Sequence, residues 1–225
     1  MQPAVQLKVL SGTTLARAQE TESGAVVPSI LAFDVNESML DIQHLGPLFK
    51  RLFGDEKFVN ELYAKFVLDS EGMDPAGSPY VPFFDLSQAM LKMMGSIRSV
   101  SIRQADIDEL ETLSAAMPAH PDVPAGLKQL KDAGFRLVTL TNSSSNAQVK
   151  QLRNAGIDGF FERKLSVDGV RRYKPAQQVY HMAAEELNVP TSACQSRVTS
   201  RQTFCGMAAR LVSRTLSHLS SRAWN

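Results

Sequence analysis

The chain has 225 residues, of which 44% are hydrophobic, and its formal net charge is +1. This length and hydrophobic content are enough for one buried core with a smaller appended unit. The balanced charge, without a basic stripe carrying interleaved aromatic residues, argues against nucleic acid as a partner and favours a small molecule. No apolar run approaches the roughly 20 residues of a membrane-spanning helix. The first 28 residues lack the order of a secretory signal, so the sequence predicts a cytoplasmic protein.

Two different hydrophobic patterns follow one another in the first half of the chain. Residues 1–28 are mostly polar and predict a weakly ordered extension. Residues 29–35 are short and continuously apolar, which is typical of a strand buried on both faces of a parallel sheet. Residues 44–117 change to helical periodicity and are interrupted by one loop rich in proline and glycine. The sequence therefore predicts a helical unit inserted after the first strand.

Strand and helix alternate again in the second half of the chain. We expect helices over 124–133, 146–155 and 175–187, and strands over 135–140 and 160–165. Such alternation predicts an α/β fold with a parallel, Rossmann-like sheet. The predicted division is a core from residues 29–43 and 118–190, a helical cap from 44–117 with a cleft between the two, and an atypical C-terminal tail from 191–225.

Polar residues follow the predicted strands at comparable places. Asp34 ends the first strand, Thr141 and Asn142 follow the second, and Lys174 precedes the last helix. The carboxyl ends of parallel strands meet at one edge of a sheet, so we expect these side chains to converge. Asp34 is then a candidate nucleophile, Thr141 and the amides near Asn142 hold an anionic oxygen, and Lys174 keeps Asp34 ionised. Each residue alone is also explained as a helix cap, a turn or a helix start, but the combination favours a catalytic site.

These residues and the helical block between them resemble the haloacid dehalogenase superfamily, and within it the type II (S)-2-haloacid dehalogenases. The resemblance covers about residues 29–190. It rests on two segments, Phe33-Asp34-Val35-Asn36-Glu37-Ser38-Met39-Leu40-Asp41 and Tyr173-Lys174-Pro175 with Tyr180. It implies a hydrolase with a core and a helical cap, and it places Asp34, Thr141 and Lys174 in catalysis.

The residue two positions after the nucleophile separates the activities of this superfamily. Its phosphatases carry a second Asp there, which protonates the departing alkoxide and whose backbone helps to bind magnesium, whereas this chain has Asn36. Asn cannot donate such a proton. A halide leaves as a stable anion and requires neither a proton nor a metal. Asn36 therefore favours cleavage of carbon–halogen bonds without a metal or cofactor, and a phosphatase is the alternative.

The resemblance implies a two-step reaction on a 2-haloalkanoic acid. Asp34 displaces the halide from C2, and water then hydrolyses the aspartyl ester to give a 2-hydroxy acid. Lys65 stands where the family often has an Arg that binds the substrate carboxylate, but Lys cannot form the two-pronged contact of Arg. Ser38 is equally well explained as a loop hydroxyl, and packing is the favoured role of Tyr180. The predicted substrate-binding residues are Asn36, Ser38, Lys65, Asn142 and Tyr180.

The pattern of this family breaks after residue 190. The family has a further strand there and an acidic residue that positions the hydrolytic water, whereas this chain has no Asp or Glu after Glu186. A shifted reading frame near residue 194 and a genuinely divergent tail both explain this change. Either one predicts slow hydrolysis of the ester, and a catalytically inactive relative is a third reading. The sequence leaves open whether the protein is a monomer or a homodimer.

Overall fold

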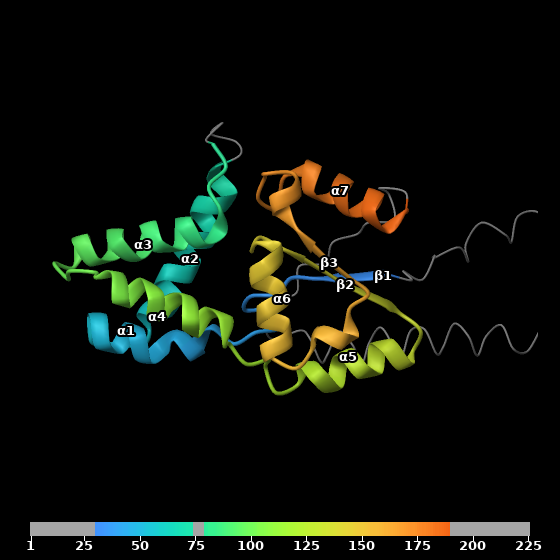
Figure 1. Cartoon of the computed structure of the whole chain (residues 1–225), viewed down its shortest axis with the longest axis horizontal. Coiled ribbons are helices and arrows are strands. Elements are labelled where there is room, and N and C mark those ends of the chain that lie inside the picture. Colours follow the sequence, from blue (N-terminus) through green and yellow to red (C-terminus); the bar gives the residue numbers. More distant parts are fainter. Residues whose placement is uncertain (1–29, 74–78, 190–225) are drawn as a thin grey trace, which may run out of the picture.

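A computed structural model of the chain describes residues 30–73 and 79–189, so the predicted N-terminal extension and C-terminal tail lie outside the described residues. A three-stranded parallel sheet lies beside a block of four helices (Figure 1). Among the described residues, no helix is long and apolar enough to cross a membrane. The elements in chain order are β1 (Ile30–Phe33), α1 (Gly46–Phe53), α2 (Phe58–Met73), α3 (Phe83–Ile97), α4 (Gln104–Ala115), α5 (Val123–Asp132), β2 (Arg136–Thr141), α6 (Ser145–Asn154), β3 (Arg163–Ser166) and α7 (Gln177–Leu187).

Strand β2 is the centre of the sheet, with β1 and β3 parallel to it on either side. All its residues except Arg136 are buried. Side chains alternate between the two faces of a strand. Leu137 accordingly belongs to the apolar cluster built with α5 and α6, whereas Val138 and Leu140 belong to the cluster built with α7. The predicted α/β fold with a doubly covered parallel sheet is confirmed.

The observed ends of the strands and helices differ from the expected ones by up to three residues; the first strand, for example, covers Ile30–Phe33 and not 29–35. Two of the differences have a visible cause. The last helix begins at Gln177, because Ala176 before it has an extended backbone with φ −55° and ψ 134°. The third strand begins at Arg163 because Asp158–Phe160 forms a 3-10 turn. Apolar periodicity alone does not separate such a turn from the start of a strand.

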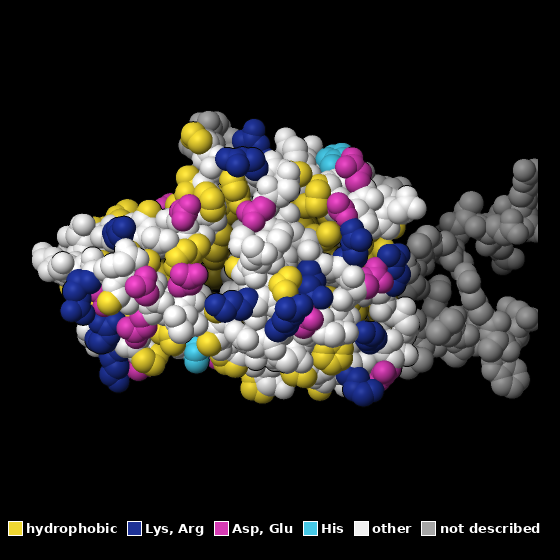
Figure 2. Space-filling model, in the orientation of Figure 1, with side chains coloured by type: hydrophobic (Ala, Val, Ile, Leu, Met, Phe, Trp, Pro, Cys, Tyr) yellow, Lys and Arg dark blue, Asp and Glu magenta, His cyan; other side chains and the backbone are white. Residues whose placement is uncertain are grey.

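The four helices α1 to α4 share their apolar interior with the sheet. Leu48, Phe49 and Met90 of the helical block belong to the same buried cluster as Leu127 and Leu137 of the α/β part. Figure 2 shows apolar side chains gathered along the boundary between the two parts, where the surface is indented. The division into cap and core remains a prediction.

The chain enters and leaves the helical block through two segments that pair with each other. Leu40 and Ala119 form an antiparallel bridge. The amide of Asp41 donates to the carbonyl of Pro118 at 2.9 Å, and that of His120 donates to the carbonyl of Met39 at 2.9 Å. This pairing fixes the turn that follows β1, and therefore the surroundings of Asp34.

Within the block, Asp106 is a buried carboxylate that joins α1 to α4. It accepts hydrogen bonds from the amide of Arg103 and from Nη1 of Arg51, both at 2.8 Å. The backbone hydrogen bond from Arg103, together with the Arg51 guanidinium, lowers the pKa of Asp106. A carboxylate with a lowered pKa stabilises the folded protein above the ordinary pKa of Asp, and this contribution is lost as the pH falls through the lowered value.

We expect Asp106→Asn to lower the free energy of unfolding by about 1–3 kcal/mol at neutral pH, because it weakens hydrogen bonds to a charged group. The difference from the wild type shrinks as the pH falls below about 4, where the unfolded wild-type chain begins to bind a proton at Asp106, and it is lost as the pH passes through the lowered pKa of the folded carboxylate. Urea denaturation across this pH range measures it. Asp108→Asn, at an exposed position of the same helix that bonds Gln104, is the matched control. An equal loss in both variants would contradict the structural role of Asp106.

Candidate active site

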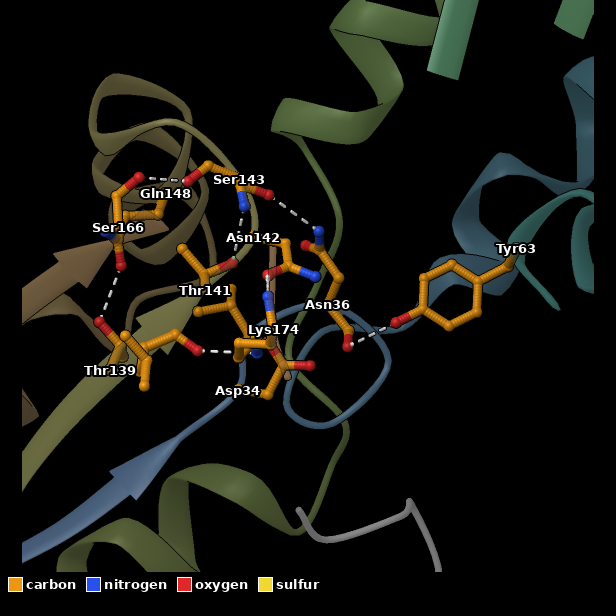
Figure 3. A network of polar contacts seen from close by, with 12 residues as sticks. Asp34, Asn36, Tyr63, Thr139, Thr141, Asn142, Ser143, Gln148, Ser166 and Lys174 are labelled. Carbon is orange, nitrogen blue, oxygen red and sulfur yellow. Dashed lines mark hydrogen bonds and ion pairs between the residues drawn. The ribbon is translucent and has the colours of Figure 1, made fainter. Parts of the chain in front are cut away.

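The carboxylate of Asp34 meets the ammonium of Lys174 directly after the end of β1. Asp34 Oδ1 lies 2.7 Å from Lys174 Nζ, and the two side chains are 27% and 15% exposed. Asp34 Oδ1 also accepts a hydrogen bond from the amide of Val35 at 2.9 Å. Figure 3 shows the two side chains pointing toward one another. The carboxylate is thus paired with a cation and still reaches solvent, as a nucleophile must.

Lys174 is fixed to the carboxyl end of β2 by two further contacts. Its Nζ donates to the carbonyl of Leu140 at 2.9 Å, and its amide donates to Oδ1 of Asn142 at 3.0 Å. The structure therefore brings Asp34, Asn142 and Lys174 together at one edge of the sheet. Their roles in catalysis and substrate binding remain predictions.

The serine-rich loop after β2 shapes the start of α6. Thr141 is 1% exposed, and its Oγ1 accepts a hydrogen bond from the amide of Ser143 at 3.1 Å. Ser144 caps α6 by accepting from the amide of Ala147. Local hydrogen bonds of this kind are usual for Ser and Thr at helix starts. The Thr141 hydroxyl sits at the strand end, as the sequence predicts. It accepts the bond from Ser143, which does not use its O–H donor, so its role toward an anionic oxygen stays a prediction.

Asn36 is buried, with 7% of its surface exposed, and both ends of its amide have protein partners. Its Nδ2 donates to Ser143 Oγ at 3.0 Å, and its Oδ1 accepts from Gln151 Nε2 at 3.3 Å. Its backbone carbonyl accepts from the hydroxyl of Tyr63 at 3.1 Å. Asn36 therefore joins the turn after β1 to the loop after β2, to α6 and to α2, so its predicted contact with substrate competes with these bonds.

Tyr63 and Gln151 belong to this arrangement but were missed from the sequence. Tyr63 reaches from α2 toward the turn after β1 (Figure 3). Burial and the nearby charges of Asp34 and Glu37 raise the pKa of Tyr63, so its hydroxyl stays protonated and remains a donor. Nothing in the sequence around Tyr63 distinguishes it from the other residues of α2. The pattern around Gln151 is a weak indication of a buried polar contact, because Gln148 and Gln151 are polar residues three positions apart on the buried side of α6.

The remaining predicted substrate-binding residues are placed differently. Lys65 lies two positions after Tyr63, about 200° around α2. Its side chain is 45% exposed and pairs with Asp69 at 3.2 Å, so the structure does not bring it to Asp34. Tyr180 is partly buried against the apolar cluster under α7. Ser38 lies half-buried in the turn after β1.

Glu37, Asp41 and His120 form a group with metal-ligand chemistry, with ligand atoms within 4.8 Å of one another. The group lies where the two segments that enter and leave the helical block meet. Its members also bond there, because Asp41 Oδ1 accepts from the amide of Gln43 at 3.0 Å and His120 Nε2 lies 3.1 Å from the carbonyl of Glu37. These contacts are enough to explain the group as part of the linker pairing.

Comparison with known proteins gives consistent results. A family model described as haloacid dehalogenase-like hydrolase matches residues 83–194. Haloacetate dehalogenase H-2 of Moraxella sp. (strain B) is 22% identical over 71% of each chain, and the (S)-2-haloacid dehalogenase of Pseudomonas sp. (strain YL) is 24% identical over 72% of this chain and 71% of its own. A phosphoglycolate phosphatase of Colwellia psychrerythraea is 37% identical, but over 33% of each chain.

Solved structures share the fold. The L-2-haloacid dehalogenase of Xanthobacter autotrophicus superimposes with a TM-score of 0.66 at 20% identity, covering 72% of this chain and 66% of that one. The L-2-haloacid dehalogenase RSc1362 gives the same TM-score at 27% identity, covering 72% and 74%. The Xanthobacter enzyme has also been solved with chloropropionic acid covalently bound.

We expect Asn36→Ala to lower the free energy of unfolding by about 1–3 kcal/mol. The variant removes the donor to the buried Ser143 Oγ and one acceptor of Gln151 Nε2, which keeps its bond to the carbonyl of Ser114. Urea denaturation of N36A, Q151A and the double variant then gives the energy that couples the two residues, about 0.5–3 kcal/mol for residues in contact. Additive losses would show that the contact contributes nothing. Asn60→Ala is the matched control, because it removes a 2.7 Å hydrogen bond with Gln43 at the surface.

Proposed function

This chain belongs to the haloacid dehalogenase-like hydrolases, and from that membership we propose that it removes halide from short 2-haloalkanoic acids. The observation that carries the proposal is the Asp34–Lys174 pair beside a buried Asn36. A carboxylate that lies 2.7 Å from a cation and still reaches solvent is able to act as a nucleophile. No acidic group stands at the position of Asn36 to protonate an alkoxide, and a halide needs no such proton.

The proposed mechanism gives different tasks to the two oxygens of Asp34. Oδ1 is held by Lys174 and by the amide of Val35, which leaves Oδ2 as the attacking atom. In the first step Oδ2 forms a bond to C2 of the substrate while the carbon–halogen bond breaks, and the halide departs with the bonding electrons. In the second step water attacks the ester carbonyl carbon and releases the 2-hydroxy acid, the Asp34 carboxylate and a proton. Lys174 stabilises the carboxylate at the start and end of this cycle.

The composition of the chain after Glu186 bears on the second step. No carboxylate occurs after that residue to hold or activate water. The first step uses only Asp34 and its surroundings, whereas ester hydrolysis needs a positioned water. We therefore propose a dehalogenase whose ester intermediate hydrolyses slowly, and the extreme form of this proposal is a protein that reacts once and stops.

A phosphatase is the second candidate, favoured by the 37% identity to phosphoglycolate phosphatase over a third of the chain. Asn36 argues against it, because its amide is buried and bonded at both ends, to Ser143 and Gln151. Magnesium-dependent release of phosphate from p-nitrophenyl phosphate would favour the phosphatase. A third candidate is an inactive relative, and lack of a cooperative thermal transition in far-UV circular dichroism would favour that reading.

We expect the purified protein to release chloride from (S)-2-chloropropionate without added metal, and Asp34→Asn to abolish the release because an amide is a far weaker nucleophile. A chloride time course with intact-protein mass on quenched samples measures both steps. Sustained release means that hydrolysis proceeds. A single chloride per chain with an adduct on Asp34 means that the ester persists.

The control for this experiment is Asn60→Ala, a surface change in the helical block that should leave chloride release unaltered. Absence of both chloride and adduct, from wild-type protein with a cooperative thermal transition, would falsify the dehalogenase proposal.

A further inference from the structure

The loop that carries Lys174 is joined to the helical block by two tyrosine hydroxyls. Tyr173 is 2% exposed, and its hydroxyl donates to the carbonyl of Val81 at 2.8 Å. Tyr80 donates to Oδ1 of Asp168 at 2.6 Å. Both contacts cross from the segment that precedes α3 to the segment between β3 and α7. We call these four residues the tyrosine seam.

Aromatic packing holds the seam in place. The rings of Tyr80 and Tyr173 lie 5.2 Å apart, and the Tyr173 ring meets that of Phe66 of α2 edge-on at 6.5 Å. The Arg171 guanidinium lies 5.5 Å from the centre of the Tyr80 ring. Aromatic and cation–ring contacts of this kind each contribute favourably beyond simple burial. The seam therefore joins the two parts of the molecule through packed rings as well as through hydrogen bonds.

Both seam hydroxyls remain protonated donors. Burial is the largest cause that raises the pKa of Tyr80 and of Tyr173, and the charge of Asp168 acts in the same direction on both. Arg171 acts against this shift at Tyr80 but does not reverse it. Both hydroxyls are therefore available as hydrogen-bond donors at neutral pH.

Tyr173 is the residue directly before Lys174, and this adjacency gives the seam a consequence for the active site. The Tyr173 side chain is fixed to the helical block, while the Lys174 amide is fixed to Asn142 on the opposite side of the same peptide unit. A backbone held at both ends leaves the lysine little freedom to swing. The seam thus links the helical block to the peptide that carries Lys174, in addition to the bonds of Lys174 to Leu140 and Asn142 at the end of β2.

We propose that Tyr173 and Tyr80 are positioning residues, which place Lys174 against Asp34 only when the helical block is docked on the sheet. The placement of Lys174 follows from the contacts alone, whereas its effect on turnover rests on the proposed dehalogenase function. Small displacements of a charged group from its partner reduce catalysis strongly without changing the chemistry of any reacting group. If the seam were purely structural, loss of one of its hydrogen bonds would lower the stability of the protein and leave Lys174 in place.

Tyr173→Phe and Tyr80→Phe test the proposal, since each keeps the ring and removes one hydrogen bond across the seam. Acylation of lysines by an N-hydroxysuccinimide ester, followed by peptide mass spectrometry, reports the accessibility of Lys174 without any need for activity. We expect several-fold faster labelling of Lys174 in both variants. The internal reference is Lys164, which is 23% exposed and pairs with Asp158 at 3.2 Å, and its labelling should not change.

The kinetic arm of the test is chloride release. We expect kcat to fall about 10- to 100-fold in Tyr173→Phe with KM within about twofold of the wild type, because positioning and not binding is lost. Ser87→Ala is the matched control, because it removes a 2.9 Å hydrogen bond to Phe83 inside α3 without touching the seam. It should leave both labelling and kcat unaltered.

Two outcomes would overturn the positioning role. Unchanged labelling of Lys174 in folded Tyr173→Phe and Tyr80→Phe proteins would show that the lysine stays in place without the seam. Faster labelling of every lysine alike would show that the seam only stabilises the fold. If the wild-type protein releases no chloride, the dehalogenase proposal fails, and the labelling comparison still decides whether the seam positions Lys174.

Discussion

The 2.7 Å contact between Asp34 and Lys174 is the interaction on which the candidate site depends. Two opposite charges partly withdrawn from water are favourable together only when further hydrogen bonds satisfy them. Here the amide of Val35 donates a hydrogen bond to the Asp34 carboxylate, and the Lys174 ammonium donates one to the carbonyl of Leu140. The partners are 140 positions apart in the chain. They meet because β1 lies next to β2 in a parallel sheet and the loop before α7 returns to the same edge.

The surroundings of this pair are held by polar bonds and not by apolar packing alone. Asn36 is bonded to Ser143, Gln151 and Tyr63, which come from a loop, a sheet-covering helix and the helical block. Buried hydrogen bonds of this kind hold their side chains in one arrangement, because a broken bond would leave a polar group with neither a protein partner nor water. Asn36 thus has a structural reason to be present in addition to the chemical one. An Asp at this position would keep the acceptor for Gln151 but lose the donor to Ser143.

The helical block and the sheet depend on each other more than a simple division into cap and core implies. They share one buried apolar cluster, and they are joined at the paired segments around Leu40 and Ala119 and at the tyrosine seam. The surface is indented along the boundary between the two parts (Figure 2). The family match ends at residue 194, close to the point where the sequence loses its acidic residues.

The sequence by itself determined the class of fold and the proximity of Asp34 and Lys174. Continuous apolar strands followed by Asp34 and by Thr141 and Asn142 imply a parallel sheet, and a parallel sheet brings its strand ends together. Tertiary structure alone decided the rest. Lys65 was a candidate because it stands where the resembling family often has an Arg, but it faces solvent on α2, whereas Tyr63 reaches the site from the same helix. Gln151 and Tyr173 form hydrogen bonds with residues far along the chain. Hydrophobic periodicity indicates which side of a helix is buried, but it does not identify the residues that contact that side.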